Sequence, residues 1–370
     1  MSYFPKKNKQ WETLSPTAGG FDEIRLKNAL ELADTFESPW PYDLDIAGSV
    51  PGLTDIEKPP YNEVLGVFKP RGRNNGCILK GGKIAAQWGD VDRVDMTFSI
   101  AKSYLAILTG IAIGDGLISN VDALVRDSVR SGEFDSQQNK TISWRHLLEQ
   151  TSEWEGTLWG KPDSIDRNRQ VGTQENNSKK GDHRDLQSPG SFYEYNDVRV
   201  NLLSLCLLHV FRQPLPDILR ERVMDPIGAS DDWVWNGYKN SFVDIDGKIM
   251  QSVPGGTHWG GGIQISTADH AKFALLVHNN GLWEGRQLLP SGWCESIRRP
   301  SKANGSYGYL WWLNTNELKW PNCPSKSYAA IGAGASVIWI NPEDDMIVVA
   351  RWIENDKVPE LLSAIFQTKV

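Results

Sequence analysis

Residues 96–119 read MTFSIAKSYLAILTGIAIGDGLIS, a run in which apolar side chains return at helical spacing. The apolar positions recur every three or four residues, at Ile100, Tyr104, Leu108 and Ile111. The glycines of GDG at 114–116 end the pattern, because glycine favours turns over helix interiors. The sequence therefore predicts an apolar helix that starts near Thr97.

A serine and a lysine lie at the head of this predicted helix. Ser99 and Lys102 form the sequence S-x-x-K, and their spacing of three places both side chains on one helix face. The helix dipole and the free N–H groups of the first turn favour negative charge, which suits a serine activated as a nucleophile by an amine. The alternative is structural: a helix-capping serine followed by a solvated lysine.

Strand-like and helical segments on both sides of this helix indicate an α+β fold. CILKGGKIAAQWGD at 77–90 and ASVIWINPEDDMIVVARW at 335–352 each predict a β-hairpin around a turn. Further helices are predicted over 20–36, 142–150, 198–211 and 358–367. We expect one antiparallel sheet built from both ends of the chain, flanked by helices and carrying a helical insertion.

The 370 residues exceed the size at which one compact core stops growing, so one large domain or two closely packed domains are expected. Residues 21–98 together with 255–370 are predicted to form the sheet domain, and residues 99–254 a mainly helical domain. The active site is expected between them. The polar stretch 160–185 is predicted to be an exposed or mobile loop, suited to covering a pocket.

The sequence YEYND at 193–197 places a tyrosine and an acidic residue just before a predicted helix. A tyrosine beside a lysine ammonium ionises more readily, because the positive charge stabilises the phenolate, and it then serves as a base. Tyr195 is therefore a candidate proton carrier. The alternative is a packed tyrosine with Asp197 as the helix N-cap.

Small residues dominate YAAIGAGA at 328–335, directly before the second hairpin. Small side chains on a strand let a substrate carbonyl approach backbone N–H groups, as an oxyanion hole requires. Close helix–sheet packing also needs small residues, and it is the commoner cause.

Charge and hydropathy exclude several classes of protein. A formal net charge of -7 disfavours binding to a phosphate backbone, so no nucleic-acid partner is expected. No apolar run is long enough to cross a bilayer, and MSYFPKKNKQWETL lacks the apolar segment of a secretory signal. The sequence therefore predicts a cytoplasmic location without membrane binding.

The four cysteines lie far apart and form no C-x-x-C pair, which argues against a zinc or redox site. Reduced, mostly buried thiols are expected. No cofactor and no metal are predicted.

Taken in order, several blocks resemble the serine β-lactamase and penicillin-binding protein superfamily, within it the class C-like branch that includes family VIII esterases and 6-aminohexanoate-dimer hydrolases. Besides residues 96–119, the blocks are ISWRHLLEQTS, PGSFYEYND, GGTHWGGGIQISTADHAKFALLVHNNGLWEGRQLLP and YGYLWW. The resemblance covers about Cys77 to Ile347. It implies a β-lactamase/DD-peptidase-like fold, with an antiparallel sheet flanked by helices and a helical insertion domain.

The resemblance carries over to individual residues. Ser99 matches the acylated nucleophile, Lys102 its partner and Tyr195 the tyrosine of the family's Tyr-x-Asn motif. Asp197 stands where that motif has asparagine. A carboxylate there either holds Lys102 protonated or anchors it while Tyr195 acts as base. By the same resemblance, the N–H groups of Ser99 and Ala333 form the oxyanion hole.

The Lys-Thr-Gly segment of β-lactamases is replaced by Ala330-Ile331-Gly332, which argues against recognition of a β-lactam carboxylate. Gly332 remains a candidate substrate-binding residue. Trp154 and Trp159 are candidates for the wall of an acyl pocket, with packing as the equal alternative. His258 is a further candidate for substrate binding, although a structural hydrogen bond explains a loop histidine better than catalysis does.

Together these features predict a serine hydrolase that cleaves an ester or amide of a small acyl group through an acyl-enzyme on Ser99. One alternative is a β-lactamase or D-amino-acid peptidase. Another is a catalytically silent binding protein on the same fold. The expected partner is a small-molecule ester or amide, and the expected state is a monomer or homodimer.

Overall fold

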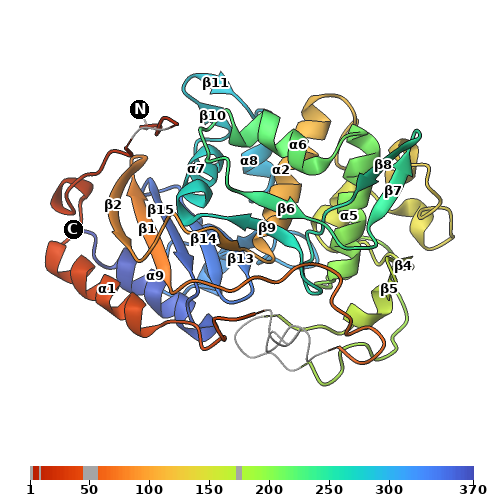
Figure 1. Ribbon diagram of the computed structural model, residues 1–370, viewed down its shortest axis with the longest axis horizontal. Helices are drawn as coiled ribbons and strands as arrows, with labels where there is room; N and C mark the ends of the chain where they lie inside the picture. Colours follow the sequence, from red (N-terminus) through yellow and green to blue (C-terminus); the bar gives the residue numbers. More distant parts are fainter. Residues whose placement is uncertain (1–2, 8–9, 45–56, 172–176) are drawn as a thin grey trace.

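The computed structural model describes residues 3–7, 10–44, 57–171 and 177–370. Its largest element is a six-stranded antiparallel sheet whose strands come from two distant parts of the chain (Figure 1). In spatial order the strands are β12 (Trp312–Leu313), β13 (Tyr328–Gly332), β14 (Ser336–Asn341), β15 (Met346–Arg351), β1 (Asn75–Lys80) and β2 (Lys83–Trp88). β1 pairs with β15, so the predicted sheet from both ends of the chain is confirmed.

Helices cover both faces of this sheet. Successive residues of β14 and β15 belong alternately to two separate buried clusters, because neighbouring side chains of a strand point to opposite faces. Helices α1 (Glu23–Thr35) and α9 (Val358–Phe366) lie side by side over one face. Helices α2 (Ile100–Gly114) and α7 (Thr267–His278) pack on the other.

The middle of the chain contributes the remaining helices and several short sheets. The helices are α3 (Val125–Ser128), α4 (Trp144–Leu148), α5 (Asp197–Phe211), α6 (Leu215–Leu219) and α8 (Trp293–Ser296), with 3-10 turns at Thr17–Gly19, Asn139–Thr141, η3 (Asp163–Asp166), Thr315–Glu317 and Asn355–Lys357 and a π turn at Arg220–Met224. A three-stranded sheet contains β3 (Asp95–Met96), β9 (Gly262–Ile265) and β6 (Val234–Asn236). Two-stranded ribbons are β4 (Thr157–Leu158) with β5 (Lys161–Pro162), β7 (Phe242–Ile245) with β8 (Lys248–Gln251), and β10 (Leu282–Trp283) with β11 (Arg286–Gln287). The division into two domains stays a prediction.

The predicted hairpins and helices form, with differences at their ends. Gly81 and Gly82 turn the first hairpin with φ of 60° and 81°, as paired glycines allow. Only α4 is much shorter than predicted. It starts late because the Ser143 side chain accepts a hydrogen bond from the His146 N–H, and it stops early because Gln150 takes a left-handed backbone with φ of 53°.

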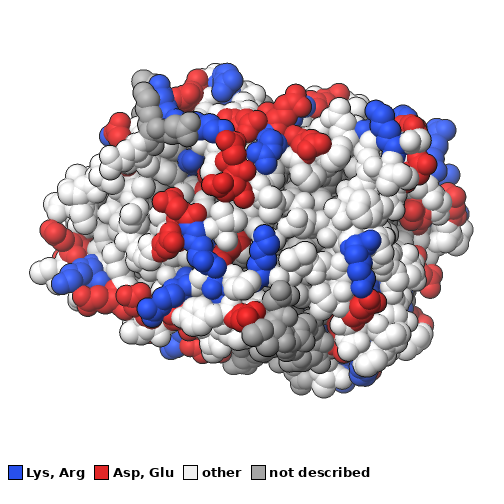
Figure 2. All heavy atoms as spheres, viewed as in Figure 1, with Lys and Arg blue, Asp and Glu red and all other residues white. Residues whose placement is uncertain are grey.

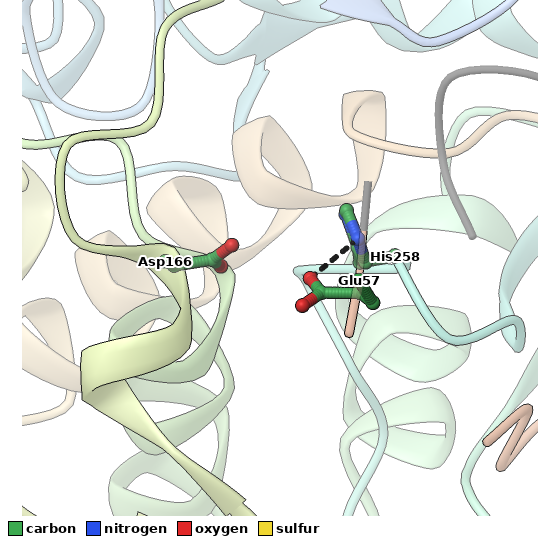
Figure 3. Close-up of side chains that lie close together, drawn as sticks. All are labelled: Glu57, Asp166 and His258. Atoms are coloured by element: carbon green, nitrogen blue, oxygen red, sulfur yellow. Dashed lines mark ion pairs between the residues drawn. The ribbon is translucent and has the colours of Figure 1, made fainter. Parts of the chain in front are cut away.

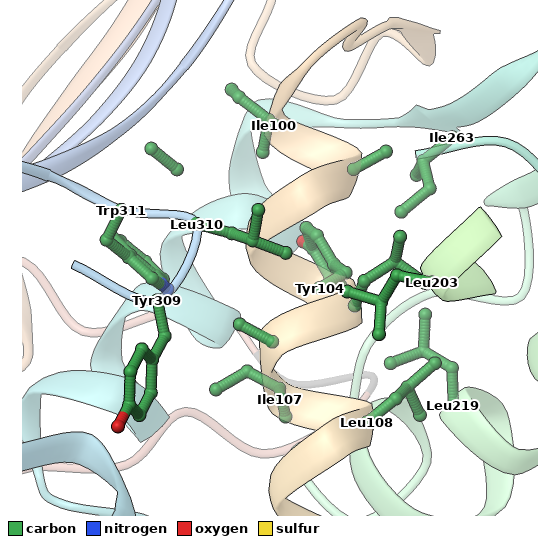
Figure 4. Close-up of a cluster of buried hydrophobic side chains, with 14 of the residues drawn as sticks. Ile100, Tyr104, Ile107, Leu108, Leu203, Leu219, Ile263, Tyr309, Leu310 and Trp311 are labelled. Carbon is green, nitrogen blue, oxygen red and sulfur yellow. The ribbon is translucent and has the colours of Figure 1, made fainter. Parts of the chain in front are cut away.

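Helix α2 is the centre of the larger core. All its residues up to Ala112 are buried. Figure 4 shows its side chains between Leu310 and Trp311 on one side and Leu203 and Leu219 on the other. A helix enclosed on all sides is held by packing, so the residue at its head has a fixed position.

A buried arginine joins the two sheets in front of α2. The Arg351 guanidinium of β15 donates to the carbonyl oxygens of Met96 at 2.6 Å and Ile265 at 3.0 Å, and to the Ser336 hydroxyl at 3.0 Å. Burial lowers its pKa to about 10, and the three acceptors replace the water it has lost. Arg351 thereby ties the end of β3 to the main sheet.

Charged side chains are mixed over the face shown in Figure 2, where Lys and Arg alternate with Asp and Glu and form no extended patch of one sign. The four cysteines are free and buried, as predicted. Within the described residues, no single helix has the length and apolar composition needed to cross a membrane; α5 and the helix after it pass such a test only as a pair bent by 77°.

Candidate active site

The end of β3 sets the position of the predicted nucleophile. The Thr97 N–H donates to a carbonyl of β9 at 3.0 Å, and Phe98 then takes a left-handed backbone with φ of 49°. A bulky residue in this conformation is strained. Its ring is held in place by edge contacts with Trp40 and Trp352. Ser99 consequently sits at the head of α2 and remains partly exposed.

Ser99 and Lys102 are in direct contact. The Lys102 Nζ donates to the Ser99 Oγ at 2.7 Å, and the lysine side chain is only 2% exposed. The Ser99 side chain makes no capping hydrogen bond to the helix. This geometry excludes the alternative of a capping serine with a solvated lysine.

Tyr195 lies against the same ammonium group. Its ring centroid is 4.6 Å from the Lys102 Nζ, and its buried ring stacks on the Trp312 indole with centroids 5.9 Å apart. Asn196, not Asp197, is the N-cap of α5, since its side chain accepts from a backbone N–H of the first turn. The structure thus brings Ser99, Lys102 and Tyr195 together, and Asp197 is free for another contact.

That contact is an ion pair with the lysine. The Asp197 Oδ1 lies 2.8 Å from the Lys102 Nζ, and both side chains are 2% exposed. Burial alone lowers the pKa of Lys102, but the charge of Asp197 and the neighbouring Tyr195 outweigh it, so the pKa of Lys102 is raised. The pKa of Asp197 is lowered, because Lys102 and Arg169 outweigh the effect of burial. At neutral pH Lys102 is therefore an ammonium, not a free amine.

Behind Asp197 lies a series of buried charges. Arg169 contacts the carboxylates of Asp197 at 3.3 Å and Asp166 at 3.5 Å. Asp166 also accepts a hydrogen bond from the Asp197 backbone N–H at 2.7 Å, and it lies 3.1 Å from the Lys180 Nζ. Positive and negative groups alternate, so each buried charge has a partner of opposite sign.

The series ends at Glu57 and His258. Lys180 contacts the Glu57 carboxylate, which lies 2.8 Å from the His258 Nε2. Figure 3 shows Glu57 and His258 facing each other, with the Asp166 carboxylate directed toward them. Burial lowers the pKa of His258, so this imidazole is neutral at pH 7. His258 is 1% exposed, so its place is in this network behind the site.

The same three side chains have the composition of a metal site. Ligand atoms of Glu57, Asp166 and His258 lie within 4.8 Å of one another. The Lys180 ammonium contacts both carboxylates and supplies the positive charge that they need. The arrangement is accounted for as an ion-pair network, and the expectation of no metal stays a prediction.

The prediction of an exposed or mobile loop at 160–185 is wrong for 161–169, where no residue is exposed, whereas residues 178, 179, 181–183 and 185 are exposed. Asp163, Asp166, Arg167 and Lys180 are buried. The segment is polar because its charges pair with one another and with the catalytic region, which sequence composition cannot distinguish from a solvated surface. Residues 172–176 lie outside the described residues.

The small-residue strand β13 closes against the nucleophile. A Cβ added to Gly332 would lie 2.1 Å from the Thr97 carbonyl oxygen and 3.3 Å from the Ser99 nitrogen, so only glycine fits this approach. The next residue, Ala333, is partly buried. Among the hydrogen bonds of the described residues, neither the Ser99 nor the Ala333 backbone N–H has an acceptor. Two such donors side by side suit a developing oxyanion.

The two tryptophan candidates lie elsewhere. Trp154 is 2% exposed and its indole donates to the Glu133 carbonyl, which fits the packing alternative. Trp159 is partly exposed and packs edge-on against Tyr238. A cleft of about 440 Å³ adjoins Tyr195 and is lined by Asn168, Arg169, Gln170, Ser178, Lys179, Phe192, Tyr193 and Glu194.

Sequence reasoning missed the residues around the predicted trio. Trp312 belongs to the block YGYLWW, but nothing in the sequence places its ring on Tyr195. The mixed signs of charge within 160–185 were a signal for internal ion pairs. Glu57 gave no signal, because its partners Lys180 and His258 are more than a hundred residues away.

Comparisons with known proteins agree on one fold. The family model described as Beta-lactamase matches residues 77–358. A Bacillus anthracis protein provisionally named 6-aminohexanoate-dimer hydrolase superposes with a TM-score of 0.61 at 14% identity, covering 99% of this chain and 88% of that one. EstCE1, described as a hydrolase with promiscuous acyltransferase activity, gives 0.57 at 14% identity over 80% and 93% of the two chains. A β-lactamase/D-alanine carboxypeptidase from Pseudomonas syringae gives 0.56 at 14% identity over 80% and 93%. No curated protein sequence matches the chain.

The fold, with a serine beside a buried lysine and a tyrosine, defines a hydrolase of the penicillin-recognising class. The matched model spans most of the residues. The chain belongs to the β-lactamase family, within the serine β-lactamase and penicillin-binding protein superfamily.

Proposed function

We propose that the protein is an esterase or amidase that hydrolyses small acyl substrates through an acyl-enzyme on Ser99. The observation that carries the proposal is the contact of a partly exposed serine with a buried, charged lysine. An ammonium cannot accept the serine proton. The base is therefore assigned to Tyr195, which lies against the Lys102 ammonium.

The proposed reaction has two halves. In the first, the Ser99 oxygen attacks the carbonyl carbon while its proton passes to the Tyr195 oxygen, and the oxyanion is held by the N–H groups of Ser99 and Ala333. Tyr195 then returns the proton to the leaving alcohol or amine as its bond to the acyl carbon breaks. In the second half, water repeats these steps on the acyl-enzyme and releases the acid.

The segment Ala330-Ile331-Gly332, which replaces the Lys-Thr-Gly of β-lactamases, favours ester and amide substrates over β-lactams. Ala330 stands where β-lactamases carry a lysine, and its side chain is buried and uncharged. Cytoplasmic location and a small-molecule substrate remain part of this proposal.

Labelling tests the nucleophile directly. We expect a fluorophosphonate to add once to the protein, on Ser99, and the Ser99→Ala variant to lose at least about a thousandfold in hydrolysis of a p-nitrophenyl ester. Peptide mass spectrometry locates the label, and melting curves check that the variant is folded. An unlabelled Ser99 would sink the proposal. Rapid turnover of nitrocefin would instead favour the β-lactamase alternative.

A further inference from the structure

A buried histidine connects helices α7 and α2 to the segment that leads into Ser99. His270 lies in the first turn of α7. Its Nε2 is 2.7 Å from the Thr97 Oγ1, and its Nδ1 is 2.9 Å from the Tyr104 hydroxyl oxygen. All three side chains are fully buried. Both ring nitrogens of His270 are therefore used inside the protein.

His270 binds these two hydroxyls as a neutral group. Burial lowers its pKa well below the ordinary value, and the charge of Arg351 lowers it further. A neutral imidazole has one N–H and one lone pair, so one hydroxyl accepts from the ring and the other donates to it. Loss of either hydroxyl leaves a buried nitrogen without its partner, which is costly.

Thr97 stands between the two backbone segments that carry the proposed oxyanion donors. Its carbonyl oxygen is the atom that Gly332 abuts, one residue before the donor Ala333. Only Phe98, with its strained left-handed backbone, separates Thr97 from the other donor, Ser99. A strained backbone persists only where its surroundings fix it. A shift of Thr97 therefore displaces both N–H groups.

The backbone and the side chain of this segment are held by different elements. The Thr97 N–H donates to the Ile263 carbonyl of β9 at 3.0 Å, and Arg351 of β15 donates to the carbonyl of Met96. Among the hydrogen bonds of the described residues, the Thr97 hydroxyl has no partner besides His270. The contact with α7 is thus a separate constraint on Thr97.

We propose that His270 is a positioning residue for the oxyanion hole: by holding the Thr97 side chain, it keeps the N–H groups of Ser99 and Ala333 where a developing oxyanion needs them. This inference rests on the proposed function. His270 is fully buried and acts through Thr97, without contact to the substrate. Because an oxyanion hole stabilises mainly the transition state, loss of His270 should lower kcat and change KM little.

Thr97→Val tests the contact from one side. Valine keeps the branched shape of threonine and removes the hydroxyl. We expect kcat for a p-nitrophenyl ester to fall by about tenfold or more with little change in KM, because displaced donors lose much of their effect. The matched control is Thr109→Val, which removes another buried hydroxyl of α2, one that donates to the Leu105 carbonyl at 2.9 Å. It should leave kcat unchanged, and melting curves compare the two losses of stability.

Two substitutions of His270 separate its two contacts. Nδ1 is bonded to Cγ, as the terminal atoms of asparagine are, whereas Nε2 lies one atom further out, as the terminal atoms of glutamine do. His270→Gln therefore keeps a partner for Thr97, and His270→Asn keeps one for Tyr104. We expect the glutamine variant to retain most of kcat and the asparagine variant to lose about as much as Thr97→Val. Adding Thr97→Val to His270→Asn should lower kcat no further, since both changes break the same contact.

The outcomes separate a positioning role from a merely structural one. Full kcat in a folded Thr97→Val protein, or a His270→Asn variant at least as active as His270→Gln, overturns the inference. Stability that falls while kcat stays constant does the same. A wild-type protein with no label on Ser99 and no ester hydrolysis refutes the proposed function and the positioning role together. A labelled, active wild type beside an unchanged Thr97→Val refutes the positioning role alone.

Discussion

The Lys102 ammonium is a charged group buried away from water. It donates to the nucleophile, pairs with Asp197 and lies over the Tyr195 ring. Because a buried charge interacts strongly with its neighbours, each of them influences how tightly Lys102 holds its proton. The replacement of the family's asparagine by Asp197 therefore changes the chemistry available to the lysine.

Asp197→Asn tests this role. Asp197 raises the pKa of Lys102, so the amide should lower that pKa and let the ammonium lose its proton at lower pH. If activity depends on the ammonium, the alkaline limb of the kcat/KM profile moves down by about one pH unit or more. Steady-state rates from neutral to strongly alkaline pH measure the shift.

The control is Asp115→Asn, which breaks a surface pair with Arg222 and should leave the profile unchanged. An alkaline limb that stays in place or moves up in Asp197→Asn contradicts the assignment of Lys102 as an ammonium. Melting curves show whether the variant is folded, since the change also leaves Arg169 with one carboxylate fewer.

At this scale, sequence predicts which of these residues lie together better than it predicts their charge state. Ser99, Lys102 and Tyr195 were predicted from motif spacing and resemblance, and the structure places them together. The sequence left two roles open for Asp197, because its effect depends on a contact with Lys102 and on burial. Neither the contact with Lys102 nor the burial can be read from the residues that neighbour Asp197 in the sequence.

Among the elements, β13 is tightly packed at its last residue. Its last residue, Gly332, abuts the Thr97 carbonyl, and it is followed by the proposed oxyanion donor Ala333. The small residues at 328–335 had two interpretations, an oxyanion hole and close packing. The approach of Gly332 to the Thr97 carbonyl fits both. Close packing against the segment before α2 is also what brings the strand to the nucleophile.

Gly332→Ala should therefore reduce catalysis more than stability. The new Cβ cannot coexist with the Thr97 oxygen, so the end of β13 must shift and Ala333 with it. A misplaced oxyanion donor lowers kcat by about a hundredfold or more, whereas local crowding removes about 1–3 kcal/mol of unfolding free energy. Ester hydrolysis and urea titrations measure the two effects.

Gly305→Ala is the matched control, because no atom lies within 4 Å of its added Cβ. It should leave kcat unchanged. Full activity in Gly332→Ala, with the protein folded, would contradict the role of this strand in the oxyanion hole.

The described part of 160–185 is the segment that sequence predicted least well. Its buried side chains hold partners from two other regions: Glu57, and Asp197 and Arg199 at the start of α5. A charge pattern indicates that pairs exist, but not which distant residue completes each one. The hairpins and long helices needed no such information, since turn residues and apolar periodicity define them locally.

The main sheet holds distant parts of the molecule together. β1 and β15 pair inside this sheet although they come from distant parts of the described chain. Strand-like apolar runs around turns near both ends made this pairing predictable. The three-stranded sheet was not predicted, because two of its strands have only two or three residues in register.

Hydrogen exchange should reveal this centre. Amides of β1, β14 and β15 are expected to exchange most slowly, through global unfolding, while the β7–β8 ribbon, with Phe242 and Ile249 exposed, opens locally and exchanges early. Mass spectrometry of peptides from both regions measures the difference. Equal protection of the ribbon and the central strands would contradict this distribution of stability.

Arg351 also determines how late in synthesis the candidate site can be completed. The carbonyl of Met96, three residues before the proposed nucleophile, is held by a guanidinium that the ribosome adds some 250 residues later. A nascent chain can already contain Ser99, Lys102 and Tyr195 before β15, whose Arg351 holds the Met96 carbonyl, has been synthesised. Under the proposed function, the reactivity of Ser99 therefore has to await the synthesis of β15.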